Sequence, residues 1–249
     1  MPDHSFRLIR FDRVASTQEE ARRSARAGCP SGTVVLAEEQ TAGRGREGRV
    51  WESARGLGLW FTIVHRSRRA SNEWPALTVA SAVALCEAIE AIGLHPRTRW
   101  PNDVLLSGRK VSGVLAGTDE DAILIGVGLN LLHDTGDFSP GLREIATSIG
   151  LEARLAGIAP PDREAFLSSI LASFDRHLRG FEQSGPPIAL GAFWERAIDR
   201  SRRLVVRLPS AILVEGIATG LGEIGQLLVE TADGLVAIPS GAVIWREGQ

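Results

Sequence analysis

The residue types best suited to chemistry are concentrated in two short segments. One segment, Arg99–Asp103, reads Arg-Trp-Pro-Asn-Asp and is followed seven residues later by Lys110 and then by Gly113. The other, Gly43–Trp51, holds three arginines and three glycines. Cations, an amide and a carboxylate together suit a site that holds phosphate and reacts at a carboxylate.

The arginine-rich segment also carries a glycine pattern that is typical of another class of protein. Residues 43–48 formally match the Gly-x-Gly-x-x-Gly fingerprint of dinucleotide-binding proteins. That fingerprint must open a helix and be followed by an acidic residue about 20 positions later. Here another expected strand follows, and residues 62–66 carry no acid, which disfavours an NAD site. Arg44, Arg46 and Arg49 instead suit bidentate contacts to phosphate, with a solvated basic turn as the alternative.

Lys110 starts the returning strand of an expected hairpin, a place where most lysines are simply solvated. Its neighbours favour a functional role. Pro101 fixes its own φ and stiffens the turn that carries Asn102 and Asp103, and Gly113 within a strand marks a close approach by a ligand or another backbone. An ammonium group there can neutralise a carboxylate and an α-phosphate. Asp103 either orients an incoming amine or caps the turn.

Three other side chains have two interpretations each. Trp51 either stacks on a purine or anchors its loop in the core. Asn130 follows a glycine-rich strand and either contacts a nucleotide or metal-bound phosphate or only ends the strand. Cys86 lies within an expected helix, where a packed core thiol is favoured over a reactive one.

Composition limits the class of protein. The chain has 249 residues, of which 44% are hydrophobic and 23% charged, enough for one sizeable core and a small appended domain. A net charge of −2 argues against DNA binding driven by bulk charge. Cys29 and Cys86 predict reduced thiols in a cytoplasmic protein. No secretory signal or membrane-spanning run is visible.

The histidines and the helical spacing add two expectations. Five scattered histidines predict no dedicated metal site, so Mg²⁺ is expected to arrive with a nucleotide. Ser16 is expected to cap a helix, and the polar loop 133–141 is a candidate for ordering on ligand binding. Strands are expected at 6–11, 33–37, 57–64, 104–106, 111–116 and 123–131, and helices from 17 to near 28 and at 75–92, 161–181 and 188–198.

The character of the chain changes after Arg200. Five short strands are expected within the last 50 residues, at 204–208, 212–219, 226–230, 235–239 and 243–246, with a hairpin turn at Asp233-Gly234. Such a series predicts a small β-barrel. We therefore expect an α+β fold in which a mixed sheet with flanking helices occupies residues 1–200 and a small β domain occupies 201–249.

Taken in order, the motifs resemble those of the biotin–protein ligases over nearly the whole chain. The resemblance rests on several short signatures that follow one another in the order typical of the family. It implies a mixed α+β catalytic domain followed by an SH3-like β domain. The signatures are Ser16-Thr17, Glu38-x-Gln40-x-x-Gly43-Arg44-Gly45-Arg46, Arg49-x-Trp51, Arg99-Trp100-Pro101-Asn102-Asp103, Arg109-Lys110-x-x-Gly113 and Gly126-x-Gly128-x-Asn130.

The resemblance implies a two-step reaction. The carboxylate of biotin attacks the α-phosphate of Mg·ATP to give biotinyl-5′-AMP and pyrophosphate. A specific lysine of a biotin carboxyl carrier domain then attacks the mixed anhydride, and AMP leaves. The first step brings two anions together, which calls for a preorganised cationic site. The intermediate needs shelter from water, for which residues 43–50 and 133–141 are the candidate closing loops.

The same resemblance implies roles for single residues. Catalysis is assigned to Lys110, Arg46 and Asp103, where Asp103 assists the acceptor amine. Gln18 is the weakest assignment because the family commonly has Asn after Ser-Thr. Biotin binding is assigned to Ser16, Thr17, Gln18, Gln40, Gly43, Arg44, Gly45, Arg46, Lys110 and Gly113, and ATP binding to Arg44, Arg46, Arg49, Trp51, Asn102, Lys110 and Asn130.

Three other functions compete with this interpretation. A lipoate–protein ligase shares the chemistry but is expected to carry other Arg and Gly signatures. A non-catalytic nucleotide-binding or carrier-docking protein would not need Lys110, Arg46 and Asp103. An NAD-dependent oxidoreductase lacks the helix and acid noted above. We expect no DNA partner, because the first strand starts near Phe6, and no membrane partner; a homodimer through an exposed edge strand stays open.

Overall fold

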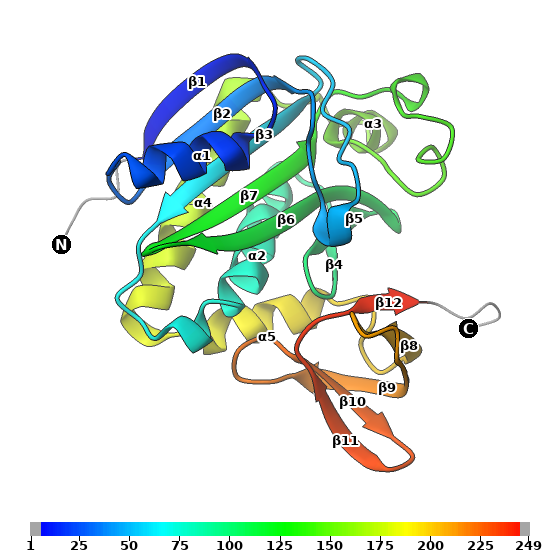
Figure 1. The fold of residues 1–249 in the computed structure, drawn as a ribbon. Helices are drawn as coiled ribbons and strands as arrows, with labels where there is room; N and C mark the ends of the chain where they lie inside the picture. The colour runs from blue at the N-terminus through cyan, green and yellow to red at the C-terminus, as the bar shows by residue number, and fades with distance from the viewer. Residues whose placement is uncertain (1–5, 245–249) are drawn as a thin grey trace.

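The computed structural model describes residues 6–244, which form two β-sheets and five α-helices within that range (Figure 1). The larger sheet has seven strands in the order β1-β2-β3-β7-β6-β5-β4. Strands β1 and β2 are parallel and the other neighbours are antiparallel. The strands are β1 (Arg7–Val14), β2 (Thr33–Gln40), β3 (Gly58–His65), β4 (Arg97–Arg99), β5 (Asp103–Leu106), β6 (Arg109–Asp119) and β7 (Ala122–Asn130).

Helices cover both faces of this sheet. Helix α1 (Thr17–Arg26) lies on one face, and α2 (Ala76–Glu90) and α4 (Arg163–Ser184) lie on the other (Figure 1). As predicted, Ser16 caps α1, with its side chain accepting a hydrogen bond from the N–H of Gln18. Helix α2 is buried nearly all round, and Cys86 within it is inaccessible, so burial raises the pKa of its thiol to about 12. The core-thiol interpretation of Cys86 is confirmed.

The predicted hairpin that carries Lys110 is confirmed. Ser107 and Gly108 form its two-residue turn with φ of 48° and 77°, as the tight turns favoured by the twist of antiparallel strands require. Asp103 pairs with Gly113 across the two strands. The hairpin therefore fixes Asp103, Lys110 and Gly113 relative to one another.

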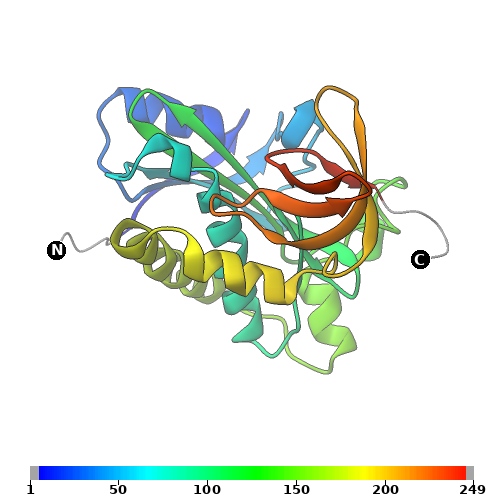
Figure 2. The ribbon, with the colours of Figure 1, turned by 90° about the horizontal axis from the view of Figure 1, so that it is seen from below.

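The second sheet contains the five predicted C-terminal strands in the order β11-β10-β9-β8-β12, all antiparallel. This arrangement fits an SH3-like domain, and it lies beside helix α5 (Pro187–Arg196), as Figure 2 shows. Gly234, with φ of 114°, opens β11 after the predicted turn. The strands are β8 (Arg203–Arg207), β9 (Leu213–Leu221), β10 (Leu227–Thr231), β11 (Gly234–Ile238) and β12 (Ala242–Ile244); positions 245–246 of the last predicted strand lie outside the described residues.

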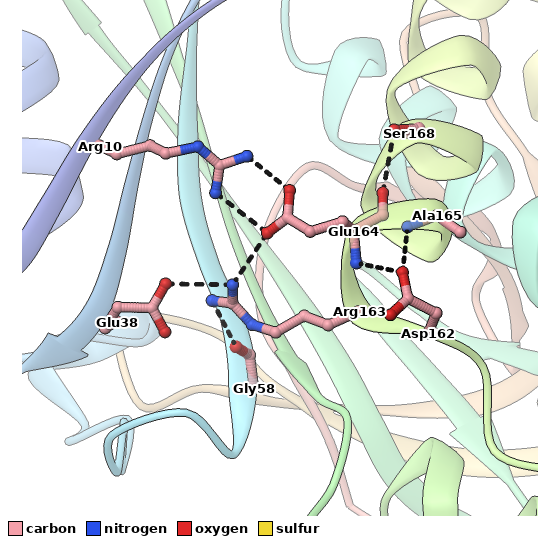
Figure 3. A network of polar contacts seen from close by, with 8 residues as sticks. All are labelled: Arg10, Glu38, Gly58, Asp162, Arg163, Glu164, Ala165 and Ser168. Atoms are coloured by element: carbon pink, nitrogen blue, oxygen red, sulfur yellow. Dashed lines mark hydrogen bonds and ion pairs between the residues drawn. The ribbon is translucent and has the colours of Figure 1, made fainter.

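A network of ion pairs joins the larger sheet to the start of α4 (Figure 3). Arg10 on β1 forms two hydrogen bonds with the carboxylate of Glu164, at 3.1 and 2.6 Å. Arg163 pairs with Glu38 on β2 at 3.0 Å and with Glu164 at 3.3 Å. Asp162 caps the helix by accepting from two backbone N–H groups. The network holds α4 against β1 and β2, and β2 ends at Gln40.

One hydrophobic cluster runs through both sheets. It includes Phe61 and Leu85 in the first part of the chain, Phe193 on α5, and Leu204 and Val229 in the second sheet. The second sheet therefore packs on the first part of the protein through α5. Within residues 6–244, none of the helices combines the length and apolarity needed to cross a bilayer.

One strand and one α-helix were not predicted. Strand β4 has three residues, two of them arginines, and it forms because Thr98 pairs with Val104 on β5. Helix α3 (Ile149–Leu155) has seven residues, capped by Ser148, whose side chain accepts from the N–H of Leu151. Both are too short for hydrophobic periodicity to reveal them.

Candidate active site

A cavity of about 360 Å³ opens on the larger sheet, between the N-terminus of α1, the segment 44–52 and the Arg99–Asp103 turn. It brings together residues that are up to 227 positions apart in the sequence, from Ser16 to Val243. The predicted site residues at its wall are Ser16, Thr17, Gln18, Gln40, Arg44, Gly45, Arg46, Arg49, Trp51, Asn102, Asp103, Lys110, Gly113 and Asn130.

Gly43 is the predicted site residue that lies behind this wall. Its carbonyl accepts from the N–H of Trp51 at 2.9 Å, closing the base of a narrow hairpin. A Cβ atom at position 43 would come within 3 Å of the Trp51 carbonyl and the Ser53 hydroxyl. Glycine is needed there because two backbone segments meet, and Gly43 shapes the site without facing it.

One end of the cavity is a hydrogen-bonding pocket. The backbone N–H and hydroxyl of Thr17 both donate to Oε1 of Gln40, at 2.8 and 3.1 Å. The same hydroxyl lies 2.9 Å from that of Thr62, and the amide nitrogen of Gln40 donates to Ser53. Ser16 and Thr17 are buried. These side chains hold one another in fixed rotamers, so the pocket presents a preorganised set of polar groups.

Gln18 contributes to the cavity differently from an asparagine. Its amide nitrogen donates to the carbonyls of Leu115 on β6 and Leu124 on β7, at 3.0 and 3.4 Å. The longer side chain thus reaches the sheet backbone, and its donor is used by the fold. The Gln18 amide packs over Gly126 on β7, where a Cβ would lie at an ordinary contact distance of 3.6 Å from it.

The segment 43–51 is an ordered hairpin rather than an open loop. Arg44 forms an isolated antiparallel bridge with Val50, and the N–H of Gly45 donates to Arg49 at 2.7 Å. The turn uses positive φ at Glu47 (57°) and Gly48 (73°). The hairpin therefore projects its arginine side chains over the mouth of the cavity from a defined backbone.

The three arginines of this hairpin have different partners. Arg49 pairs with Glu47 at 3.1 Å. Arg46 is half-buried and donates to the carbonyl of Gly241 at 3.1 Å, and burial lowers its pKa although the guanidinium stays charged. Arg44 is exposed and has no ion pair or hydrogen bond from its side chain within residues 6–244. Arg44 is thus a cation available to an anionic ligand.

Lys110 and Asp103 form an ion pair at the centre of the wall. The ammonium nitrogen lies 2.5 Å from the carboxylate and 5.2 Å from the ring centroid of Trp51. The side chain of Lys110 is 33% exposed, so solvent and ligands reach it. A Cβ on Gly113 would lie 3.1 Å from the end of Lys110 and 3.3 Å from the Trp51 ring, so the glycine lets both side chains pack close to the strand.

Trp51 anchors the hairpin to the sheet. Its ring lies edge-on to Trp60 with a centroid distance of 6.4 Å. A Cβ at Gly128 would come within 3 Å of the Trp51 ring, so this glycine makes room for it. The indole nitrogen is buried and without a hydrogen-bond partner among the described residues. Trp51 also lines the cavity, so the core contact and a ligand contact are compatible.

The two asparagines are fixed through their amide nitrogens. Asn102 donates to the carbonyl of Val114 at 2.6 Å, and Asn130 donates to that of Thr147 at 3.0 Å. Both are buried and line the cavity. Each uses one N–H to stabilise the wall, which leaves the amide oxygen and the second N–H with hydrogen-bonding capacity.

Several residues at the wall escaped the sequence reasoning. Thr62 is an ordinary strand residue in sequence and gains its position through pairing of β2 with β3. His133 and Phe138 stack at 4.8 Å and are both buried, so this part of the predicted loop 133–141 is packed. Residues 241–243 reach the cavity from the second sheet. Their glycine-alanine pattern carries no chemical signal that could have revealed this.

The wall offers few ligands to a metal ion. Within residues 6–244 there is no cluster of three or more His, Cys, Asp or Glu side chains able to hold one. Asp103 and Glu52 supply carboxylates at the cavity. Mg²⁺ is commonly held by one or two carboxylates together with substrate phosphates, so this wall fits a cation that arrives on a nucleotide.

Comparison with known proteins points to one family. The model of the Biotin/lipoate A/B protein ligase family matches residues 11–130. The Bifunctional ligase/repressor BirA of Bacillus subtilis is 36% identical over 244 residues, covering 95% of this chain and 73% of that protein. The biotin–[acetyl-CoA-carboxylase] ligase of Paracoccus denitrificans is 31% identical over 244 residues, covering 94% of this chain and 98% of that protein.

A solved structure agrees with the sequence relatives. The biotin protein ligase from Aquifex aeolicus in complex with biotin and ATP has a TM-score of 0.83 and 27% identity, and the match covers 96% of this chain and 98% of that one. The likeness extends over both sheets. The chain belongs to the biotin–protein ligases of the biotin/lipoate A/B protein ligase family.

Proposed function

We propose that this ligase activates biotin as biotinyl-5′-AMP and transfers it to a lysine of a biotin carboxyl carrier domain. One observation carries the proposal: a single cavity joins a neutral hydrogen-bonding pocket around Thr17 and Gln40 to a cationic mouth around Arg44 and Lys110. A ligand with a polar neutral ring system at one end and a carboxylate at the other matches that division.

The first step uses the cations. Ser16, Thr17 and Gln40 hold the ureido end of biotin, and Arg44, Arg46 and Lys110 lie where its carboxylate meets ATP. A carboxylate oxygen bonds to the α-phosphorus as the bond to pyrophosphate breaks. Fixed positive charge offsets the repulsion between the two anions and stabilises the charge that develops in the transition state.

The second step uses the Lys110–Asp103 pair. The acceptor amine bonds to the acyl carbon, the bond to the adenylate oxygen breaks, and AMP leaves. Asp103 takes a proton from the amine, a role that requires Lys110 to turn toward the departing phosphate. Lys110 is partly exposed and flexible enough for this movement.

The nucleotide is placed beside Trp51, Asn102, Asn130 and Arg49. Trp51, Asn102 and Asn130 line the same cavity. Mg²⁺ bound to the ATP phosphates would add positive charge, with Asp103 nearby as a carboxylate oxygen donor. The hairpin 43–51 and the segment 133–141 exclude water from the intermediate.

An open strand edge supports docking of the carrier. Strand β5 pairs with β6 only as far as Gly113, and Asn102 covers Val114 beyond it. Backbone N–H and C=O groups alternate in direction along a strand. Those of Ala116 and Thr118 therefore point to the same side as those of Val114, beyond the end of β5. A groove of about 430 Å³ runs along β6 here and shares Arg46 and Pro101 with the active site. An extended carrier segment can add to this edge.

The remaining assignments follow from this scheme. The boundary between the catalytic and SH3-like domains is placed near residue 200, between α5 and β8. A second copy of the chain could use the same β6 edge, which would make dimer formation and carrier docking compete. ATP as a substrate and the two unpaired cysteines fit the cytoplasm.

The test is exchange of labelled pyrophosphate into ATP without any carrier. Exchange that requires biotin, and that lipoate does not support, is the expected result. A folded protein that binds biotin but catalyses no exchange would overturn adenylation as its reaction. Addition of a carrier domain, followed by mass spectrometry of the modified lysine, then tests the transfer step.

A further inference from the structure

A buried carboxylate lies under the turn that carries the reactive residues. After α5, Ala197 forms a parallel bridge with Thr98 on β4, and the N–H of Ile198 donates to the carbonyl of Thr98 at 2.9 Å. The chain therefore runs along the edge of the larger sheet before entering β8. The next residue, Asp199, has no exposed surface.

Asp199 holds the backbone at the start of the turn. Its Oδ2 accepts a hydrogen bond from the N–H of Trp100 at 3.2 Å. The indole N–H of the buried Trp100 donates to the carbonyl of Gly225 in the second sheet at 2.9 Å. Trp100 is thus tied to the interdomain segment and to the SH3-like domain, three residues before Asp103.

Burial disfavours the charged form of Asp199, and few charged groups interact with it. Burial raises the pKa of its carboxyl to about 6. The guanidinium groups of Arg99 and Arg202 and the Trp100 N–H act to lower this pKa, and the carboxylate of Asp103 acts to raise it. Oδ1 is buried and accepts no hydrogen bond within residues 6–244.

An amide oxygen would serve equally well if Asp199 only had to accept from Trp100. Asparagine accepts the same hydrogen bond without the cost of desolvating a charge. The negative charge therefore needs another explanation. The charge interacts electrostatically with Arg99, which lines the active-site cavity, and with Asp103, which pairs with Lys110.

We propose that Asp199 is a positioning residue for the turn Trp100–Asp103, and that its negative charge sets the place of Asp103 and hence of the Lys110 ammonium. This inference rests on the proposed function. Asp199 touches neither substrate, so its loss lowers the rate of reaction at the activated carboxyl and leaves binding of the biotin ring nearly unchanged.

A dependence on pH follows. Above pH 6 Asp199 is ionised, attracts Arg99 and Arg202 and repels Asp103. As pH falls through 6 the carboxyl takes up a proton, these interactions weaken, and Asp103 and Lys110 lose their fixed positions. The kcat of pyrophosphate exchange should fall on the acid side with a midpoint near 6.

The decisive variant is Asp199→Asn, which keeps the shape and the acceptor for Trp100 but removes the charge. We expect kcat for biotin-dependent exchange at pH 8 to fall roughly tenfold to a hundredfold, in the range that small misplacements of reactive groups produce. The acid-side midpoint near 6 should disappear. The KM for biotin should change less than about twofold, since the Thr17–Gln40 pocket is intact.

Controls separate this role from loss of folding. Asp233→Asn removes an exposed carboxylate in a distant hairpin turn and should leave kcat, KM and the pH profile unchanged. Asp199→Ala tests the hydrogen bond to Trp100 and should be less stable than Asp199→Asn. Thermal unfolding of each variant gives the folded fraction by which kcat is corrected.

Two outcomes overturn the inference. If Asp199→Asn has the corrected kcat and pH profile of the natural chain, its charge does not position the turn. If KM for biotin rises in step with the loss of kcat, Asp199 supports the cavity as a whole. Failure of the proposed function is distinguishable, because the natural chain itself would then show no biotin-dependent exchange.

Discussion

The ammonium group of Lys110 lies 2.5 Å from the carboxylate of Asp103, so the two residues assigned to opposite halves of the reaction are partners at rest. Each neutralises the other until an anion reaches the cavity. In the mechanism proposed above, an incoming phosphate competes for Lys110 and thereby frees Asp103. The pair links nucleotide arrival to the appearance of a base at the acceptor side.

Removal of the Lys110 amine tests this link. Lys110→Ala should reduce biotin-dependent pyrophosphate exchange at least about a hundredfold, as loss of one preorganised charge stabiliser typically does. The melting temperature should change little, because a partly exposed ion pair contributes about 1 kcal/mol or less. Lys110→Arg keeps the charge and serves as the matched variant. Exchange at the natural rate in Lys110→Ala would remove this residue from the mechanism.

Arg46 is expected to retain the intermediate. Arg46→Gly removes a half-buried cation and its hydrogen bond to Gly241, which loosens the hairpin 43–51 over the mouth. Biotinyl-5′-AMP should then escape and label lysines of a bystander protein, measured by avidin blotting. Arg68→Gly, at an exposed position outside both the hairpin 43–51 and the segment 133–141, is the control. Labelling that stays confined to the carrier lysine would contradict this account.

The composition of the chain sharpens that experiment. Lys110 is the only lysine among 249 residues, since arginine supplies the other 27 of the 28 basic side chains. An escaping acyl-adenylate thus meets no lysine of the enzyme other than Lys110. Intact-mass measurement of Arg46→Gly should show at most two labels, on Lys110 and on the α-amino group. A larger number would mean that other side chains are acylated.

The open edge of β6 is tested with proline. Thr118→Pro removes one N–H from the side that faces no neighbouring strand, where proline is tolerated. The KM for the carrier domain should rise about fivefold to tenfold, equivalent to about 1 kcal/mol for a lost backbone hydrogen bond. Pyrophosphate exchange should be unchanged, and Thr118→Ala should behave like the natural chain. An unchanged KM in Thr118→Pro would place the carrier elsewhere.

Acid sensitivity is predicted at Glu182. Burial acts to raise its pKa, but hydrogen bonds from His65, Ser67 and the N–H of Arg68 outweigh this and hold the pKa at about 2. A carboxyl whose pKa is lowered on folding stabilises the protein above its unfolded pKa of 4.5 and loses that contribution as pH falls toward 2.

Urea unfolding measures this contribution. Glu182→Gln should reduce the free energy of unfolding at pH 7 by about 1–2 kcal/mol, the usual worth of charge-assisted hydrogen bonds. The difference from the natural chain should shrink between pH 4.5 and 2. Asp233→Asn is the control, since its carboxylate is exposed. A difference that does not depend on pH would show that the charge of Glu182 does not stabilise the fold.

The sequence alone determined the features that depend on neighbouring residues. The helix 76–90 follows from a long apolar run of alanine, leucine and similar residues without breakers. The hairpin around Ser107-Gly108 follows from turn residues that adopt positive φ. Lys110, Arg44 and Asp103 could be predicted as site residues because their chemistry is local to short motifs. Their convergence on one cavity is visible only in the fold.

The tertiary structure decided what depends on contacts distant in sequence. Thr62 joins the pocket because β3 pairs with β2, and Gly241 reaches Arg46 because the second sheet packs on α5. Gly43 lies behind the cavity wall because two backbone segments meet there. Asp199 gains its raised pKa and its place under Trp100 from burial at the edge of β4. Such environments arise only when the chain is packed, since burial and pairing across about 100 residues leave no trace in local sequence pattern.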